Sequence, residues 1–586
     1  MIWRVFSFIK PQRGLLMASF IGALIAVFFM LLIPVLIGSA IDTLINPANI
    51  NWMRLGKTIL TMVISIVLVV IFQAEVVITS GRLSFATARR LRDACFNKLQ
   101  HLPLSYLDTH AHGDIVSRIV NDCDTVSDGL YQALQQLMTG ALTVLGTLIF
   151  MFFISPPIAL IVVFLSPVSI GVAWAITRAS QKSFGSQQAL QGSLGAYIQE
   201  HIQNQKLISL FSYNDVATDG FKALNDELYT VGEKAQFASS LSNPGTRFAN
   251  NIIYAVVALV GCTAVLTGVP STLTIGGIQS FLSYTTQYTK PFNDITSVVA
   301  QMQTATASAA RIFALLDAAD EIPDAPDALK LPSLIKGDIA FNAVDFSYSP
   351  TKPFIENLSF SIGQGEQIAL VGPTGCGKTT LINLLLRFYD IDEGEITVDG
   401  LNTRLVARTS LRKAFGMVLQ DTWLFEGSIL ENIRYGNPDA NDEDVKEAAR
   451  SAYAESFIQQ LPDGYNTVLG PGGGSLSEGQ RQLLCIARTM LQNPSILLLD
   501  EATSSIDTRT EVLVQDAFDT MIKGRTSLIV AHRLSTIRNA TCILVMKDGK
   551  IVERGNHEEL IRAGGFYREL YESQWKTSEA EEKATF

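Results

Sequence analysis

The most informative stretch of this 586-residue sequence is Gly372-Pro373-Thr374-Gly375-Cys376-Gly377-Lys378-Thr379-Thr380. It has the spacing G-x-x-x-x-G-K-[ST], follows the apolar run 368–371 and precedes the apolar run 381–386. A strand, a glycine-rich loop and a helix in this order form a cradle whose backbone N–H groups point at phosphate oxygens. Lys378 would reach the β- and γ-phosphates, and the Thr379 hydroxyl would ligate Mg²⁺. The stretch therefore predicts a nucleotide-binding site in an α/β domain.

The composition points to a membrane protein. Apolar residues make up 48% of the chain and charged residues only 17%, whereas soluble proteins carry about 25% charged residues. The net charge of −10, with no basic stripe, argues against a nucleic-acid partner. The six cysteines contain no C-x-x-C pair, which predicts neither a disulfide framework nor a zinc site.

The first half of the chain, residues 1–316, contains long apolar segments with very few charged residues. Since a bilayer core needs about 20 helical residues, we expect six spans. They lie near residues 14–41, 58–80, 133–154, 157–178, 248–268 and 274–305. Six basic residues occur in the loop 82–130 and none in the tight turns after the third and fifth spans. The long loops, the N-terminus and the second half of the chain are therefore expected on the cytoplasmic side of the cell membrane.

Both long cytoplasmic loops are rich in helix formers, so we expect them to extend the spans and to carry a short crossing helix at each tip. The candidate tips are 113–122 and 208–215, whose apolar residues favour a docking role. Within the sixth span, Lys290 and Asp294 share one helix face. Ionisable groups at membrane depth are costly, so the two residues either line a cavity or satisfy each other.

An acidic segment with three prolines, residues 317–336, reads as a linker. Residues 337–575 form the second domain, and residues 576–586 form a polar tail. Several candidate residues follow the phosphate loop in a fixed order. They are Gln420 after an apolar strand, Leu476-Ser477-Glu478-Gly479-Gln480 before a helix, Asp500 and Glu501 after the strand 496–499, Asp507, and His532 after the strand 528–531.

The residue types suit phosphoryl transfer from ATP. Gln420 can reach Mg²⁺ or the attacking water, and Asp500 is placed to hold the water shell of the metal. Glu501 would polarise the attacking water, and His532 is positioned for contact with the γ-phosphate. Thr379, Gln420 and Asp500 are thus the candidate metal residues.

This ordered set of motifs resembles the nucleotide-binding domain of ABC transporters. With six spans before it, the whole chain resembles an ABC exporter half-transporter of the type I exporter (type IV) fold: a helical transmembrane bundle fused to an α/β P-loop domain. The resemblance implies that Tyr348 stacks on adenine, that residues 476–480 form the signature and that Asp507 lies in the D-loop. It also implies two composite ATP sites in a dimer, whose closure and opening drive export of a hydrophobic or amphipathic substrate.

Two departures from the family pattern bear on the partner. Glu478 stands where the signature has glycine, and 470–474 lacks the usual glutamate. The Glu478 carboxylate either lies near a γ-phosphate and disfavours closure, or points to solvent at a helix N-terminus. Beside intact Glu501 and His532, the altered signature resembles the catalytically competent subunit of a heterodimeric bacterial multidrug exporter, whose partner chain has a weakened Walker B motif. The alternatives are a homodimeric lipid or peptide exporter and an ATP-gated channel or regulator.

Overall fold

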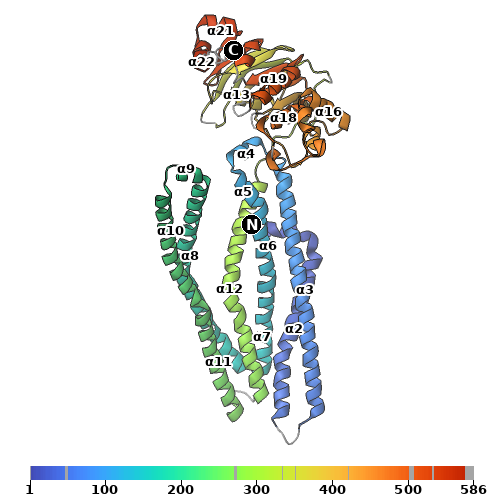
Figure 1. Ribbon diagram of the computed structural model, residues 1–586. Coiled ribbons are helices and arrows are strands. Elements are labelled where there is room, and N and C mark those ends of the chain that lie inside the picture. The colour runs from blue at the N-terminus through green and yellow to red at the C-terminus, as the bar shows by residue number, and fades with distance from the viewer. Residues whose placement is uncertain are drawn as a thin grey trace. The chain divides into compact units, whose positions relative to one another are not determined.

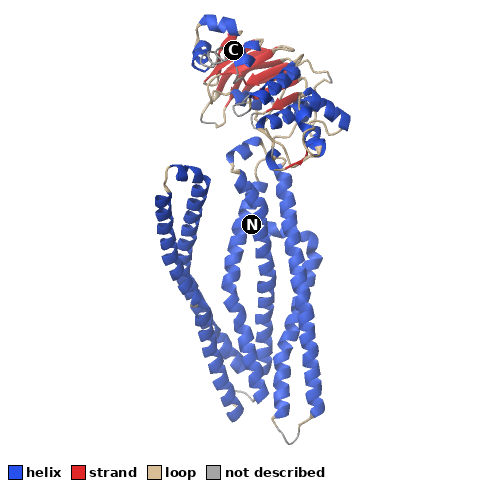
Figure 2. Cartoon of the chain, viewed as in Figure 1, coloured by secondary structure: helices blue, strands red, loops and turns tan. Residues whose placement is uncertain are grey.

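The computed structural model describes residues 2–45, 50–269, 273–332, 334–349, 352–419, 422–474, 476–500, 507–530 and 534–574. The chain divides into two compact units. Unit 1 takes in Met1–His101 and His110–Ala318, and unit 2 takes in Leu102–Thr109 and Ala319–Phe586. Figure 2 shows that the strands belong to unit 2, whereas unit 1 is helical.

Unit 1 is a bundle of long helices (Figure 1). The helices are α1 (Ile2–Ile9), η1 (Lys10–Gln12), α2 (Arg13–Leu44), α3 (Trp52–Leu99), α5 (His112–Ser117), η3 (Arg118–Asp122), α6 (Cys123–Gln132), η4 (Ala133–Met138), α7 (Thr139–Ile154), α8 (Pro156–Gln203), α9 (Gln205–Leu210), α10 (Asn214–Ser240), α11 (Ser242–Thr267) and α12 (Ile275–Leu316). Helices α3 and α8 each have 48 residues. At 1.5 Å per residue each is about 72 Å long, which is more than twice the roughly 30 Å of a bilayer core. The spans therefore continue as helices into the long loops, as the sequence predicts.

Among the described residues, four helical segments are long and apolar enough to cross a membrane, judged by length and composition. They are Arg4–Leu44, Trp52–Leu99, His112–Ile154 and Pro244–Thr267, and a shorter apolar helix covers Pro156–Val168. The predicted sixth span, 274–305, falls on α12 and its N-cap residue Thr274, and α12 is not one of the four. The number of six spans thus remains a prediction.

Small and hydroxylated residues let the helices of unit 1 approach closely. Ser19 of α2 and Ser80 of α3 share a buried hydrogen bond of 3.0 Å. The Ser280 hydroxyl of α12 donates to the carbonyl oxygen of Pro34 at 2.8 Å. Helix α2 runs through Pro34 without interruption. Packing of this kind, with hydrogen bonds between helices, is typical of membrane bundles.

Unit 2 is built on two main sheets. The strands are β1 (Ile339–Phe346), β2 (Ile355–Ile362), β3 (Gln367–Val371), β4 (Glu393–Val398), β5 (Leu401–Asn402), β6 (Phe415–Val418), β7 (Gly427–Ser428), β8 (Val468–Leu469), β9 (Ile496–Asp500), β10 (Thr526–Val530), β11 (Cys542–Lys547) and β12 (Lys550–Gly555). An antiparallel sheet has the order β2-β1-β4-β5, and a mostly parallel sheet has the order β12-β11-β3-β10-β9-β6. Strand β3, which leads into the phosphate loop, is central in the parallel sheet and buried on both faces, which explains its continuous apolar run.

The helices of unit 2 cover this sheet and form a separate helical part. They are α4 (Leu104–Thr109), α13 (Lys378–Leu385), α14 (Arg408–Lys413), α15 (Ile429–Arg434), α16 (Asp442–Ser451), α17 (Glu455–Ile458), α18 (Glu478–Gln492), α19 (Thr508–Ile522), α20 (Leu534–Asn539), α21 (His557–Ala563) and α22 (Phe566–Gln574). One apolar core joins the two sheets around β3 and α13, and a second core packs α15 to α19 together.

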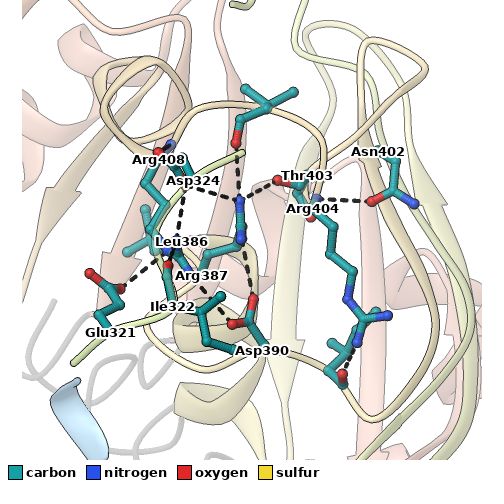
Figure 3. Close-up of polar contacts among 12 residues, drawn as sticks. Glu321, Ile322, Asp324, Leu386, Arg387, Asp390, Asn402, Thr403, Arg404 and Arg408 are labelled. Carbon is teal, nitrogen blue, oxygen red and sulfur yellow. Dashed lines mark hydrogen bonds and ion pairs between the residues drawn. The ribbon is translucent and has the colours of Figure 1, made fainter. Parts of the chain in front are cut away.

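The predicted linker is fastened to unit 2 (Figure 3). Leu329 pairs with Val406 in a parallel bridge. The Arg408 side chain donates to the carboxylate of Asp324 at 2.9 Å and to the carbonyl oxygen of Ile322 at 2.5 Å. The segment from Ala319 onward therefore belongs to the second unit and is held there by hydrogen bonds and ion pairs.

Helix α4 is the part of the first long loop that belongs to unit 2. The Tyr389 hydroxyl donates a hydrogen bond to the Asp108 carboxylate of this helix. The predicted tip at 113–122 lies instead in α5 and η3 of unit 1. The segment of this loop that contacts unit 2 is thus α4, and not the predicted tip at 113–122. The two segments could not be told apart in the sequence, because both have apolar residues at helical spacing.

Candidate nucleotide-binding site

The phosphate loop connects β3 to α13, and its glycines are required by the backbone. A Cβ atom on Gly372 would lie 2.3 Å from the carbonyl oxygen of Met546. Gly375 and Gly377 have φ angles of +82° and +111°, in the left-handed region that side chains disfavour. The spacing of glycines that predicted the loop is therefore explained by close approach at one position and by backbone conformation at two others.

Lys378 begins helix α13 and is held by its own loop. Its Nζ atom donates to the carbonyl oxygens of Gly372 at 2.7 Å and of Pro373 at 3.1 Å. The side chain is buried, with 9% of its surface exposed. The Lys378 ammonium group and the N-terminus of α13 are both positive, and both lie at this loop. Together they make the concave loop strongly positive, which favours binding of a phosphate group.

Tyr348 stands beside the start of α13 with 51% of its surface exposed. Its hydroxyl shares a hydrogen bond of 3.0 Å with the buried Thr380 hydroxyl. Its ring lies edge-on to the rings of Phe346 and Tyr389, at centroid distances of 4.8 and 5.1 Å. A third contact, with the tilted ring of Phe354 at 5.5 Å, helps to fix the Tyr348 ring next to the loop.

The ends of three parallel strands meet near this loop. Val530 of β10 is in register with Leu370 of β3 on one side and with Asp500 of β9 on the other. Asp500, the last residue of β9, is therefore level with the end of the strand that enters the phosphate loop. In α/β sheets the carboxyl edge of the strands is where ligands bind.

Three predicted residues, Gln420, Glu501 and His532, lie outside the described residues. In the sequence they follow the ends of β6, β9 and β10 by two, one and two residues. These three strands are neighbours in the parallel sheet, with the order β10-β9-β6. The roles of the three residues remain predictions.

The signature residues form the start of helix α18. Ser477 is the N-cap: its hydroxyl accepts from the backbone N–H of Gln480 at 3.3 Å, and the Gln480 side chain accepts from the backbone N–H of Ser477 at 3.0 Å. Leu476 is buried at 6% exposure, and Gly479 in the first turn is also buried. The reciprocal cap fixes the direction in which the first N–H groups of the helix point.

Glu478, the departure from the family pattern, is engaged on both of its carboxylate oxygens. One oxygen accepts from the Thr422 hydroxyl at 2.9 Å, and the other pairs with the Arg481 guanidinium. The carboxyl group therefore does not simply point to solvent, as one of the two expectations had it. Its negative charge is offset by a cation three residues along the helix.

Asp507 is the N-cap of α19 and accepts from the backbone N–H of Thr510 at 3.0 Å. This hydrogen bond holds the pKa of the Asp507 carboxyl below its usual range. Sequence reasoning assigned Asp507 to the D-loop without predicting its capping role, and it missed Thr422 and Arg481 as the partners of Glu478. Arg481 was detectable from its i+3 spacing to Glu478, whereas Thr422 was not, because it is 56 residues away.

The fold and the site define a membrane protein with a P-loop nucleotide-binding domain. Residues 16–292 match the family model of the ABC transporter transmembrane region, and residues 355–504 match the family model of the ABC transporter. The chain is 40% identical over 575 residues to the uncharacterized ABC transporter ATP-binding protein YfiC of Bacillus subtilis (strain 168), covering 98% of this chain and 94% of that protein. This chain belongs to the ABC transporter family.

Two further similarities refine this assignment. The chain is 44% identical over 484 residues to a fatty acid ABC transporter ATP-binding/permease protein of Mycobacterium bovis (strain ATCC BAA-935 / AF2122/97), covering 83% of this chain and 76% of that protein. It superimposes on the structure of a bacterial Atm1-family ABC exporter with ATP bound, with a TM-score of 0.78 and 27% identity, covering 96% of this chain and 98% of the other. These findings confirm the predicted fold class and the predicted ATP-hydrolysing half-transporter of the exporter type.

Proposed function

We propose that two chains of this kind bind ATP between the phosphate loop of one and the signature helix of the other. The observation that supports this is the capped start of α18, where Ser477 leaves first-turn N–H groups available to an anion. Each chain has one phosphate loop and one signature. Two complete ATP sites therefore require two chains.

The side chains around the loop have the chemistry that ATP needs. Tyr348 offers an exposed ring for stacking on adenine, and Lys378 would exchange its bonds to loop carbonyls for bonds to the β- and γ-phosphates. The exchange leaves the ammonium group hydrogen-bonded in both states.

Mg²⁺ fits the residues at the carboxyl edge of the sheet. Thr379 presents an exposed hydroxyl in the first turn of α13, and Asp500 ends β9 at the same edge. Oxygen ligands of these types are those that Mg²⁺ prefers, and Gln420 is the third candidate. When bound, the ion neutralises charge on the phosphates. Glu501 would polarise the attacking water, with His532 at the γ-phosphate.

Binding and release of ATP would drive alternating access of the transmembrane unit to the two sides of the membrane. Two short helices are suited to transmit the motion. Helix α4 already docks on unit 2, and the end of α9 exposes Leu210, Phe211 and Tyr213, with 75%, 71% and 55% of their surfaces accessible. Exposed apolar side chains in a row suit docking on a second chain.

Export is the proposed direction of transport, and the similarity to an Atm1-family ABC exporter supports it. The six basic residues in 82–130 support a cytoplasmic location of the long loops and the nucleotide-binding domain, in a protein of the cell membrane. A lipid-like amphiphile is favoured over a drug as the substrate, because a relative 44% identical to this chain is named for fatty acids.

The partner is proposed to be a different chain with a weakened Walker B motif. Support comes from the sequence, in which intact Glu501 and His532 accompany a signature altered at Glu478. Co-expression with the neighbouring genes and co-purification test this, together with ATP hydrolysis by the isolated chain. A slow rate that rises when the partner is added is expected. A homodimer that hydrolyses ATP at full rate, with the rate abolished by Glu501→Gln, would contradict the need for a distinct partner.

A further inference from the structure

Unit 1 contains an almost wholly apolar cavity of about 240 Å³ beside its N-terminal helix α1. Helices α1, α6, η4 and α12 enclose it, and α1 contributes Val5, Phe6 and Ile9 to its lining. Among the described residues that line it, Thr306 alone has a polar side chain, and its hydroxyl already donates to the carbonyl oxygen of Met302 at 2.6 Å. The cavity therefore offers contacts to an alkyl group and no side-chain hydrogen bond.

Small side chains leave the space that α1 covers. Helices α6 and α12 run side by side (Figure 1). They meet so closely that a Cβ atom on Gly129 would lie 2.3 Å from the Cβ atom of Ala305. Ala133 and Ala309 continue the small side chains along the lining. Ala133 belongs to η4, a π-helical turn, and such turns are frequent at functional sites.

Helix α1 is fastened on two sides, so it does not simply collapse into the cavity. The Arg4 guanidinium donates to both carboxylate oxygens of Asp317, at 2.6 and 2.7 Å, and lies 4.1 Å from the centre of the Phe313 ring. Arg90 of α3 donates to the carbonyl oxygen of Phe8 at 2.8 Å. These contacts hold the cavity open in a fixed shape.

The cavity extends from the hydrocarbon core of the membrane to the level of the headgroups. Leu137 lies 17 residues before Ile154, the end of α7, which is about 26 Å at 1.5 Å per residue. Ala309 lies 34 residues after Ile275, the start of α12, or about 51 Å. Counted from these helix ends, a bilayer core takes up about 30 Å, and core and headgroups together about 40–45 Å.

Exposed cations stand next to the cavity. Lys10 follows Phe6 by four residues and therefore lies on the same face of the helix. Arg13 follows Lys10 by three residues across the 3₁₀ turn η1, in which such side chains are aligned. Both are exposed, and the first acidic residue of the chain is Asp42. Basic residues at a membrane surface attract anionic lipids.

A more polar cavity lies nearby and is not involved. It has a volume of about 450 Å³ and is lined by Gln135, Gln287 and Lys290. The side chain of Asp294, the predicted partner of Lys290, lies outside the described residues.

We propose that the apolar cavity beside α1 holds one acyl chain of an anionic glycerophospholipid, with the phosphate of that lipid at Lys10 and Arg13. The volume of about 240 Å³ is below the usual range of about 300–1,000 Å³ for small-molecule sites. It suits a chain whose headgroup stays outside. The inference goes beyond the proposed function, because this lipid is a bound part of the membrane that braces α1 against α6 and α12. It is not transported.

The test uses the full-length protein in phosphatidylcholine nanodiscs with a trace of phosphatidylglycerol that carries a diazirine on one acyl chain. After irradiation without ATP, digestion and mass spectrometry locate the labelled residues. We expect the label to concentrate in 126–137 and 302–309. Added phosphatidylglycerol should displace at least about fivefold more label than added phosphatidylcholine, because each nearby basic residue strengthens the attraction of an anionic lipid by about this factor.

Variants that fill the cavity locate the acyl chain. Ala133→Phe and Thr306→Phe each place a ring in the cavity from a different helix, and each should lower labelling of the lining at least about fivefold. Ala141→Phe is the matched control, because it adds the same ring at an exposed position of α7 outside the lining. It should leave the labelling unchanged. Size-exclusion chromatography shows which variants fold, and either filling variant suffices for the test.

A second pair of variants locates the headgroup. The double substitution Lys10→Gln and Arg13→Gln should reduce the preference for phosphatidylglycerol to within about twofold. Arg54→Gln together with Lys57→Gln removes the same two charges, at the same spacing, from exposed positions at the start of α3. This control should keep the preference.

Several results would overturn the proposal. They are label spread evenly over the exposed helix faces, unchanged labelling of the lining in the folded filling variants, and equal displacement by the two phospholipids. Displacement by hexadecanoate that exceeds displacement by phosphatidylglycerol would also overturn it, because the ligand would then be a free fatty acid. The measurement needs neither ATP nor transport, so its outcome is independent of the proposed function.

Discussion

The substitution Asp324→Asn is expected to destabilise unit 2, because it removes a negative charge from between two buried guanidinium groups. The side chains of Arg387 and Arg408 are 8% and 7% exposed, and that of Asp324 is 27% exposed. Figure 3 shows the side chains of Arg387, Arg408 and Asp324 converging with that of Asp390. Burial, together with the neighbouring Arg408 charge, lowers the pKa of Arg387, so these cations depend on nearby anions.

The size of the effect follows from the ion pairs that the substitution removes. Asp324 accepts a charged hydrogen bond of 2.9 Å from Arg408 and lies 3.8 Å from Arg387. Asparagine keeps the shape and can still accept the backbone N–H of Arg408, which now bonds at 2.8 Å. Breaking a buried ion pair costs about 3–5 kcal/mol. Asp390 and Glu321 remain near the guanidinium groups and partly compensate, so we expect a loss of about 2–3 kcal/mol.

Differential scanning calorimetry of the full-length chain measures this loss of stability. The transition of unit 2 is identified by its rise on addition of ATP. A loss of about 2–3 kcal/mol lowers Tm by about 4–12 °C for a domain of this size. Asp327→Asn is the matched control, because Asp327 lies in the same segment with an exposed side chain. A shift below about 1 °C, or one equal to that of the control, would refute the idea that the ion network fastens the linker.

Three other substitutions test the site. Lys378→Ala should raise the Kd for a fluorescent ATP analogue at least about tenfold, because it removes the cation of the phosphate loop. Tyr389→Phe should leave that Kd unchanged but reduce substrate-stimulated ATP hydrolysis about two- to fivefold, because it removes the bond to α4; an unchanged stimulation argues against this contact. Glu478→Gly should raise the ATP hydrolysis rate of the assembled transporter about two- to fivefold, because it removes a carboxylate at the phosphate-facing helix start; a lower rate would show that the bond to Thr422 is needed.

The sequence was sufficient for features determined by local chemistry. The glycine spacing, the apolar strands and the helix at the signature each depend on residues within a few positions, and the structure has all three. Contacts between distant segments could not be read in this way. The bond of Glu478 to Thr422 and the docking of α4 through Asp108 require the tertiary fold. Periodicity alone did not distinguish α4 from the following helix, because both have apolar residues at helical spacing.

The contacts within unit 2 join the nucleotide loop to the segment that comes from the membrane unit. Thr380 in the first turn of α13 bonds to Tyr348, the Tyr348 ring lies edge-on to Tyr389, and Tyr389 donates to Asp108 of α4. Each link is a direct contact, and the ring of Tyr348 is the one most exposed to an arriving base. Because packed aromatic rings shift together rather than deform, a base stacked on Tyr348 changes the position available to Tyr389. Tyr348, the residue proposed to stack on adenine, is therefore two contacts from the helix proposed to carry the signal to the membrane.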